Sequence, residues 1–387
     1  MKRFSLIAFA VLCAFTSQVL FAQADDTAKK TDVKPLVAKA KLFAKLPAGM
    51  DGPDGLTVSP KTGTIFLTVP NFNSGGRAND PKIPKKNPGV LAKVSMDGNV
   101  EKILEFPVLE STGQTGCMGL VFGPDGNLYV CDNQYFFDTD HKSRVLRVLM
   151  DGDKPTGKVE VAVEGLNLAN AAAWHGNKLY VSDTFLDIPG MTGAGGIWTF
   201  PANEILKAGN GKVPTIKVKP ATAKPRDRHL VVVLEAKKSE RGDNAGFDGI
   251  TFGPDGTLYT GNFGDGTLYA IRFGRLSTRI QEIHKGESVI KCCDGIFYDK
   301  GTNKVYINDS QRNAIWAFKP PRRNESAKLE LIAENGDTNG ADGSLDQPCE
   351  CVVIGKKMII VNFDWPFPGL VNTKFDEPST LSLIELP

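Results

Sequence analysis

One short phrase recurs along the chain and constrains its fold more than any other feature. Each copy has an apolar run, a turn rich in Gly, Asp, Asn or Lys, and a second run of β-type residues, which is typical of a β-hairpin. Six copies begin at Pro53 (PDGLTVSPKTGTIFLT), Cys117 (CMGLVFGPDGNLYVCD), Ala169 (ANAAAWHGNKLYVSD), Phe247 (FDGITFGPDGTLYTGN), Cys293 (CDGIFYDKGTNKVYIND) and Cys349 (CECVVIGKKMIIVNF). A hairpin repeated six times predicts a repeat architecture.

The spacing of the copies indicates what each repeat contains. Successive copies start between 46 and 78 residues apart, which leaves room for two more strands per copy. The third strand is expected at GVLAKVSM, SRVLRVLM, GIWTFPA, LYAIRF and AIWAF. The sequence therefore predicts an all-β, six-bladed β-propeller with four-stranded blades. Two stacked β-sandwiches are the alternative, but they would not explain why each hairpin opens with the same kind of polar residue.

The two ends of the repeat region carry strand patterns of their own. PLVAKAKLFAKL (35–46) alternates as a strand should, and STLSLIEL (379–386) does so near the other end. We expect both to complete the last blade, so that N- and C-terminal strands close the ring and protect its edges. Residues 35–387 are thus predicted to be one domain. The Lys/Pro-rich stretch 206–228 is predicted to be a surface loop.

The N-terminus has the pattern of a secretory signal peptide. Lys2 and Arg3 precede the apolar run FSLIAFAVLCAF, and AQA at 22–24 supplies a cleavage site of small residues. The run is too short to span a bilayer, and Cys13 does not follow a small residue, so neither a membrane span nor a lipid anchor is expected. We predict a signal peptide at 1–24, a linker at 25–34, and export to the periplasm or the extracellular space.

The charge balance argues against nucleic acid as a partner. Cleavage removes Lys2 and Arg3 from the 46 basic residues and leaves 44 basic against 44 acidic residues. Without a basic excess, binding to a phosphate backbone is not expected.

Six cysteines remain after cleavage: Cys117, Cys131, Cys292, Cys293, Cys349 and Cys351. An oxidising compartment permits disulfides, but the sequence does not choose among the pairings. A zinc site is disfavoured because the CxxC spacing is absent and no histidine is near.

The residue that opens the inner strand of each repeat is the main functional candidate. In a propeller the first strand of each blade lines the central channel, so these residues form a ring around one axis. They are Asp54, Met118, Asn170, Asp248, Asp294 and Glu350. Carboxylates held together away from water repel one another, and a hard cation with oxygen ligands relieves this repulsion. The alternative is structural, since an Asp-Gly pair at the start of a strand also caps loop backbone.

These features resemble the senescence marker protein/gluconolactonase/luciferin-regenerating enzyme family of calcium-dependent propellers. The similarity rests on the ordered set of opening residues and on the ending NFDWPFPGLVNTKFDEPSTLS (362–382), and it covers essentially the whole mature chain. It implies a metal held by Asp54, Asn170 and Asp248, with calcium or another divalent cation as the cofactor. Asp54 stands where the family usually has Glu, and Met118 stands where family enzymes offer Asn. A thioether is a poor calcium ligand, so either Asp294 and Glu350 compensate from the other side, or the metal and substrate sit differently.

The resemblance also implies an activity. It is hydrolysis of a lactone or related ester, with a small molecule such as a sugar lactone as the partner and Asp248 as general base or nucleophile. Asp294 is the second candidate for that role. No G-x-S-x-G elbow, H-E-x-x-H motif or P-loop occurs. The alternative is an exported propeller that binds a small molecule, carbohydrate or protein without turnover. The aromatic run NFDWPFPG (362–369) has two possible roles: its rings line the mouth of a ligand site, or they pack the closing blade.

Overall fold

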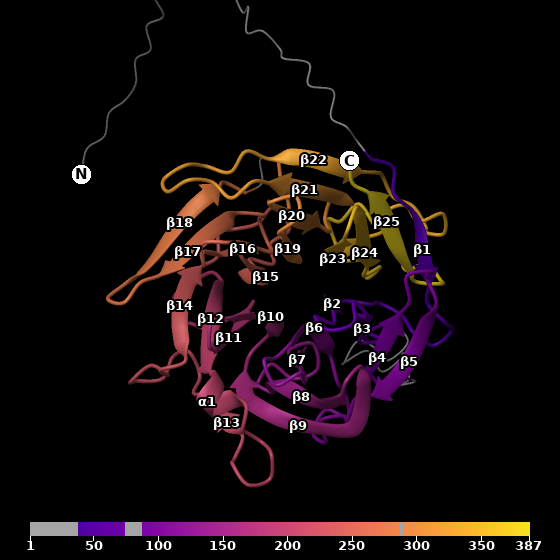
Figure 1. The fold of residues 1–387 in the computed structure, drawn as a ribbon. Helices are drawn as coiled ribbons and strands as arrows, with labels where there is room; N and C mark the ends of the chain where they lie inside the picture. The colour runs from indigo at the N-terminus through magenta and orange to yellow at the C-terminus, as the bar shows by residue number, and fades with distance from the viewer. Residues whose placement is uncertain (1–37, 74–86, 287–288) are drawn as a thin grey trace, which may run out of the picture. The chain divides into compact units, whose positions relative to one another are not determined.

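The six predicted repeats form six β-sheets in the computed structural model of the protein, which describes residues 38–73, 87–286 and 289–387. Figure 1 shows the sheets set around a common axis, with the first strand of each repeat innermost. The predicted all-β, six-bladed β-propeller with four-stranded blades is confirmed. The signal peptide and linker predicted at 1–24 and 25–34 lie outside the described residues.

Blades 1 to 3 follow one another along the chain, and each is antiparallel. Blade 1 contains β2 (Leu56–Val58), β3 (Ile65–Val69), β4 (Val90–Val94) and β5 (Val100–Glu105). Blade 2 contains β6 (Cys117–Phe122), β7 (Leu128–Asp132), β8 (Ser143–Asp151) and β9 (Lys154–Leu166). Blade 3 contains β10 (Ala169–His175), β11 (Lys178–Asp183), β12 (Ala194–Pro201) and β14 (Leu230–Glu235).

Blades 4 and 5 repeat this order. Blade 4 contains β15 (Phe247–Phe252), β16 (Leu258–Asn262), β17 (Leu268–Phe273) and β18 (Thr278–His284). Blade 5 contains β19 (Ile296–Asp299), β20 (Lys304–Asp309), β21 (Ala314–Phe318) and β22 (Glu330–Glu334). Within the described ranges there is one α-helix, α1 (Ala202–Ile205), and no helix there is long and apolar enough to cross a bilayer.

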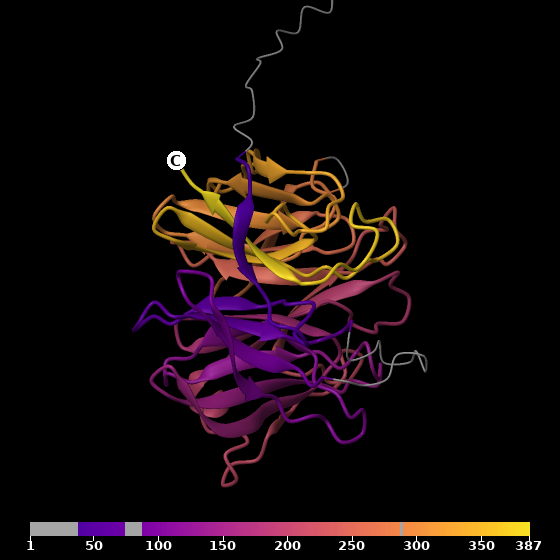
Figure 2. The ribbon, with the colours of Figure 1, turned by 90° about the vertical axis from the view of Figure 1, so that its right-hand side faces the viewer.

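Blade 6 joins the two ends of the repeat region. It contains β23 (Pro348–Ile354), β24 (Lys357–Asn362), β25 (Thr380–Glu385) and, outermost, β1 (Lys41–Lys45). β1 pairs antiparallel with β25, from Lys41 opposite Leu383 to Lys45 opposite Thr380. Figure 2 shows the indigo β1 beside the yellow C-terminal strand. Closure by N- and C-terminal strands is thus confirmed, because the N-terminal segment supplies the strand that the last repeat lacks.

The Lys/Pro-rich stretch 206–228 is more than the surface loop predicted for it. It contains a two-residue strand, β13 (Ile216–Lys217), which pairs parallel with β9 of blade 2. β9 is the outer strand of its blade, and such an edge has unpaired N–H and C=O groups that accept a further strand. The excursion therefore covers an edge that the repeat pattern alone leaves open.

In the blades whose second strand contains the recurring Leu-Tyr pair, the tyrosine packs that strand against the next blade. Tyr129 lies edge-on to Trp174 with ring centroids 5.4 Å apart, and Tyr259 lies edge-on to Phe318 at 5.5 Å. Both tyrosines are almost completely buried. The Leu-Tyr signal in the sequence thus reflects packing between blades and not chemistry.

In blades 2 to 6 an Asp or Asn ends the second strand, and in blades 2 and 3 this residue has a structural role. The Asp183 carboxylate accepts hydrogen bonds from the backbone N–H of Asn167 (3.1 Å) and Leu168 (2.7 Å), just before β10. Asp132 accepts from the N–H of Gly116 at 2.9 Å in the same way. These side chains hold the loop that leads into the innermost strand, so they set the position of the residue that opens it.

We expect Asp183→Ala to destabilise the protein by about 3 kcal/mol, because it leaves buried donors without an acceptor. The Trp198 Nε1–H, 3.1 Å from the carboxylate, would lose its partner together with the two backbone groups. Urea denaturation followed by tryptophan fluorescence would measure this loss. Asp140→Ala, at an 81% exposed side chain, is the control and should change stability by less than about 0.5 kcal/mol. Equal stability of the two variants would contradict the structural role.

Glycine follows the opening residue in four blades because neighbouring inner strands touch there. A Cβ atom on Gly55 would lie 2.5 Å from the carbonyl oxygen of Met118, and one on Gly295 would lie 2.2 Å from that of Cys349. Across the second contact, the Gly295 N–H donates a hydrogen bond to the Cys349 oxygen. This backbone contact brings the residues that precede the glycines into one small space.

All six cysteines expected in the mature chain are free and buried. Burial raises the pKa of the Cys117 and Cys349 thiols well above the usual value, so both are neutral. These cysteines act as small apolar side chains between the strands.

Candidate active site

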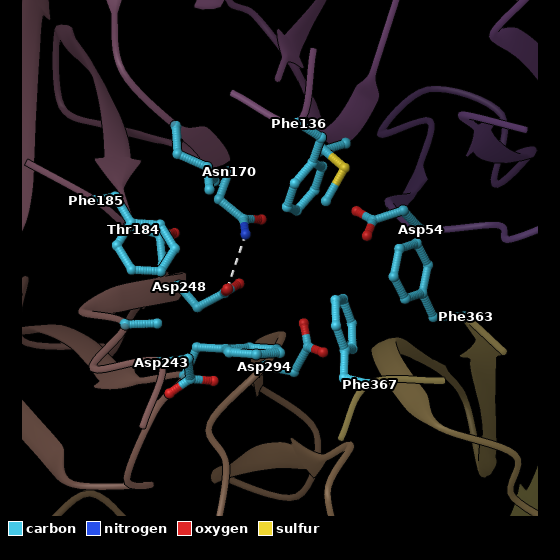
Figure 3. Close-up of a pocket in the computed structure, with 14 residues that line it drawn as sticks. Asp54, Phe136, Asn170, Thr184, Phe185, Asp243, Asp248, Asp294, Phe363 and Phe367 are labelled. Atoms are coloured by element: carbon cyan, nitrogen blue, oxygen red, sulfur yellow. Dashed lines mark hydrogen bonds between the residues drawn. The ribbon is translucent and has the colours of Figure 1, made fainter. Parts of the chain in front are cut away.

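A cavity of about 220 Å³ lies at the end of the propeller where the inner strands begin. Five of the six opening residues line it, as Figure 3 shows for those that it labels. The lining residues are Asp54, Met118, Phe136, Leu168, Asn170, Thr184, Phe185, Asp243, Ala245, Asp248, Phe263, Asp294, Phe363 and Phe367. The structure thus brings the predicted residues Asp54, Asn170, Asp248 and Asp294 into one cavity with Met118.

Irregular backbone aims these side chains inward. The pairing of β15 with β16 shifts register between Phe247 and Ile250, so Asp248 lies at a bulge, and Asn170 lies at the corresponding shift in β10. Bulges commonly turn a side chain toward a site. Behind the bulge, the Thr260 hydroxyl donates a hydrogen bond to the Gly249 carbonyl at 2.8 Å. A second-strand side chain therefore satisfies backbone that the regular ladder leaves unpaired.

The Asp54 carboxyl is buried and receives little support from its surroundings. Its side chain is 8% exposed, and no hydrogen bond or ion pair to it is found among the residues that the structure describes. Burial raises its pKa to about 7. An ionised carboxylate at this position needs a positive partner that the described protein groups do not supply.

Asp248 and Asp294 add to the same concentration of negative charge. Burial raises the pKa of Asp248 well above its usual value, and repulsion from Asp294, Asp54 and Glu350 raises it further. Burial and repulsion from Asp54 also raise the pKa of Asp294, while a hydrogen bond from Ser310 opposes the shift. Among residues 38–73, 87–286 and 289–387, no Lys, Arg or His lines the cavity.

Asn170 and Asp248 form a direct pair across two blades. The Asn170 Nδ2 donates a hydrogen bond to the Asp248 Oδ2 at 2.8 Å, drawn as the dashed line in Figure 3. This bond engages one carboxylate oxygen of Asp248, and the other has no hydrogen-bond partner among the described residues. The amide oxygen of Asn170 takes no part in this bond and can be offered to a cation.

Glu350 lies apart from the other predicted residues. It lines a second cavity, of about 560 Å³, together with residues from the far ends of the inner strands such as Trp174 and Phe252. Its Oε1 accepts a hydrogen bond from the Cys351 N–H at 2.8 Å. Burial raises its pKa, and repulsion from Asp54 and Asp294 contributes, so it still acts on the first cavity electrostatically. Its role as a metal ligand stays a prediction.

The chemistry of the donor set fits a hard divalent cation, but the donor side chains are too far apart to coordinate one without moving. Asp54, Asn170 and Asp248 offer two carboxylates and an amide, which are oxygen ligands of the kind that calcium prefers. Across residues 38–73, 87–286 and 289–387, no three Asp, Glu, His or Cys side chains are close enough to hold an ion by themselves. A cation would therefore use the amide, and the carboxylates would draw together around it.

The aromatic lining is the part of the site that the opening residues do not predict. Phe363 and Phe367 come from the NFDWPFPG run, and both line the cavity. Trp365 between them is buried against their rings, with centroids 5.5 and 5.1 Å away. The run therefore lines the cavity and also packs its own blade. Phe136, Phe185 and Phe263 come from other blades, and no repeat pattern marked them.

Calcium is expected to stabilise the protein more at pH 8 than at pH 5. The pKa of Asp54 in the folded state, about 7, lies above its unfolded value near 3.9. Between these values the folded state retains a proton that the unfolded state has lost, so the free energy of unfolding falls as pH rises. A cation that binds the ionised carboxylate offsets this loss.

Thermal unfolding with calcium and with chelator would check this expectation, with a difference in midpoint at least about 2 °C larger at pH 8. Other buried carboxyls titrate in both samples, so the informative quantity is the shift that calcium causes. Asp54→Asn is the matched variant and should reduce that shift. The same shift at both pH values would contradict the expectation.

Comparison with known proteins establishes the propeller fold and does not establish a family. No protein-family model matches the sequence, and no curated protein matches it. Among solved structures, the PQQ-bound aldose sugar dehydrogenase of Streptomyces coelicolor is 16% identical, with a TM-score of 0.56, covering 90% of this chain and 99% of that one.

Two further structures are named for activities related to the predicted family. A luciferin-regenerating enzyme is 12% identical with a TM-score of 0.52, covering 91% of this chain and 96% of its own. A putative gluconolactonase is 13% identical with a TM-score of 0.50, covering 91% and 93%. At these identities the similarity establishes the propeller, and the site must be argued from its own residues.

Proposed function

We propose that the protein is a calcium-dependent hydrolase of a lactone or related ester, with the carboxylate-lined cavity as its active site. The observation that carries this proposal is the convergence of Asp54, Asp248 and Asp294 on one cavity, where the described lining contains no basic side chain. So much buried negative charge is costly for a purely structural element. Buried carboxylates are favourable in an active site, because they can hold a cation next to a reacting group. The gluconolactonase and luciferin-regenerating enzyme similarities in fold agree with this proposal.

Asp54, Asn170 and Asp248 would hold the cation. Glu350, which lines the second cavity, would stabilise the cation electrostatically. Bound calcium would polarise the substrate carbonyl as a Lewis acid. Asp54 and Asp248 are buried and line the cavity together with Asn170, so few water molecules would compete for the ion. Another divalent cation with a preference for oxygen ligands could replace calcium.

Asp248 is the proposed general base or nucleophile. Its Oδ2 is held by Asn170, so the carboxylate has a fixed orientation, and its other oxygen can accept a proton from water or attack the carbonyl. Burial raises the pKa of Asp248 toward the range where a carboxylate is an effective base, while a nearby cation acts in the opposite direction. Asp294 faces the same cavity and is the second candidate.

The proposal places this activity outside the cytoplasm, in the periplasm or the extracellular space. Its basis is the basic-apolar-small pattern of residues 1–24. A small neutral molecule is the proposed partner.

A non-catalytic binding propeller is the second candidate, and Met118 favours it. Met118 is 5% exposed and lines the cavity at a position where an amide would help to bind a metal or a polar substrate. A thioether does neither well. In this alternative any metal is structural and the cavity only retains its ligand.

Hydrolysis of a lactone panel with calcium and with chelator would separate the two. Lactonase activity that disappears with chelator and returns with calcium is the expected result. Purified protein that leaves every lactone intact under both conditions, while still binding calcium, would support the binding propeller instead.

A further inference from the structure

We infer that the site selects a lactone or ester carrying an apolar group, aryl or alkyl, over a polyhydroxylated sugar lactone. This inference rests on the proposed function for its reaction but on a different part of the cavity for its evidence. We call Asp54, Asn170, Asp248 and Asp294, at the starts of the inner strands, the floor of the cavity. The rest of the described lining, which we call the walls, comes from loops of blades 2, 3, 4 and 6, except for Met118 in β6.

The walls are almost entirely apolar. Eight of their side chains are apolar: Phe136, Phe185, Phe263, Phe363, Phe367, Met118, Leu168 and Ala245. Figure 3 shows the labelled phenylalanines around the same space as the carboxylates. An apolar substituent that enters this space leaves water for contact with aromatic rings, which is favourable in proportion to the area buried.

Polar groups above the floor are few in the described lining. The Asp243 carboxylate is already engaged, because it accepts a hydrogen bond from the Ser239 hydroxyl at 2.8 Å and pairs with Arg241 at 2.9 Å. Thr184 is 2% exposed, and its hydroxyl has no hydrogen-bond partner among the residues that the structure describes. It can serve one polar atom of a ligand. A sugar lactone would bury several hydroxyls against the rings without partners, which lowers its affinity.

The aromatic walls are held in place before any ligand binds. Trp365 is 3% exposed and packs against Phe136 with ring centroids 5.0 Å apart, as it does against Phe363 and Phe367. On the opposite side, Phe185 stacks on Tyr135 at 5.2 Å with an interplanar angle of 15°. Phe263 lies under the Arg241 guanidinium, 4.8 Å from the ring centroid. Little side-chain freedom remains to be lost, so the walls favour a flat apolar ligand.

The test compares two six-membered lactones, 3,4-dihydrocoumarin and glucono-δ-lactone, in the presence of calcium. We expect kcat/KM for dihydrocoumarin to be at least about tenfold higher after correction for spontaneous hydrolysis. Phe367→Ala should lower the ratio of the two kcat/KM values at least about fivefold. Phe273→Ala, a partly buried phenylalanine of β17 outside the cavity, is the matched control and should leave the ratio unchanged.

Equilibrium binding separates this inference from the proposed reaction. 2-Tetralone, the carbocyclic ketone analogue of dihydrocoumarin, cannot be hydrolysed and should bind wild-type protein at least about tenfold more tightly than Phe367→Ala in calorimetry. Binding of this kind without hydrolysis of any lactone would uphold the apolar ligand and overturn the hydrolase. Equal or faster hydrolysis of glucono-δ-lactone would overturn the apolar selectivity and uphold the hydrolase. Failure of both binding and hydrolysis would overturn both.

Discussion

Replacing Asp248 by asparagine is expected to lower kcat for lactone hydrolysis by about 10²- to 10⁴-fold, the usual contribution of a positioned general base. Asparagine keeps the shape of the side chain and its place beside Asn170, but it can neither accept the proton from water nor attack the carbonyl. Steady-state rates with calcium at saturating concentration would measure the loss. Saturation matters because the substitution also removes a proposed ligand and so weakens calcium binding.

Asp265→Asn is the matched control. Asp265 is buried in the same blade, is 2% exposed, and among the described residues accepts hydrogen bonds from the backbone and hydroxyl of Thr267 within its own turn. Its replacement should leave kcat within about threefold of wild type. Asp294→Asn distinguishes the two carboxylates, since the larger loss should occur at Asp248. Full activity of Asp248→Asn at saturating calcium would remove Asp248 from the chemistry, and a larger loss at Asp294 would exchange their roles.

Replacing Gly295 by alanine is expected to destabilise the protein by about 3 kcal/mol. The new methyl group would meet backbone on the neighbouring blade, 2.2 Å from the Cys349 carbonyl oxygen and 2.9 Å from the Cα of Glu350. Backbone cannot move aside as a side chain can, so blades 5 and 6 would have to separate. Urea denaturation should show a lower midpoint.

Gly336→Ala serves as the control for this substitution. No atom lies within 4 Å of a Cβ built at Gly336, and its φ is not in the left-handed region. Stability should therefore stay within about 0.5 kcal/mol of wild type. If Gly295→Ala were as stable as Gly336→Ala, the close contact between inner strands would not be what requires glycine after the opening residue.

The repeat pattern predicted the fold because each blade is built around the same locally encoded hairpin. Alternation, turn residues and the Leu-Tyr pair specify a hairpin within a short stretch of chain, and six such hairpins leave few architectures open. The same pattern did not predict β13, whose pairing with β9 joins Ile216 to Val163 across a long separation in sequence. Two residues carry too little pattern to reveal a strand, and only the open edge of blade 2 accounts for it.

The sequence predicted the site residues that open the inner strands, because they recur with the repeat. It did not predict the site residues that lie outside the repeat. Asp54, Asn170, Asp248 and Asp294 hold equivalent positions and reach one cavity, as their place in the phrase indicated. Glu350 holds the equivalent position too, yet it lines the other cavity. The register of β23 shifts between Pro348 and Glu350, so position in the repeat does not by itself decide which cavity a side chain faces.

By itself, the sequence determined the number of blades, the strands that close the ring and the acidic character of the channel, because these depend on patterns within single repeats. The tertiary structure alone decided that phenylalanines from four blades form one wall above three carboxylates. No local pattern contains that information, since the rings lie in loops of different length and meet only when the blades are arranged around their axis.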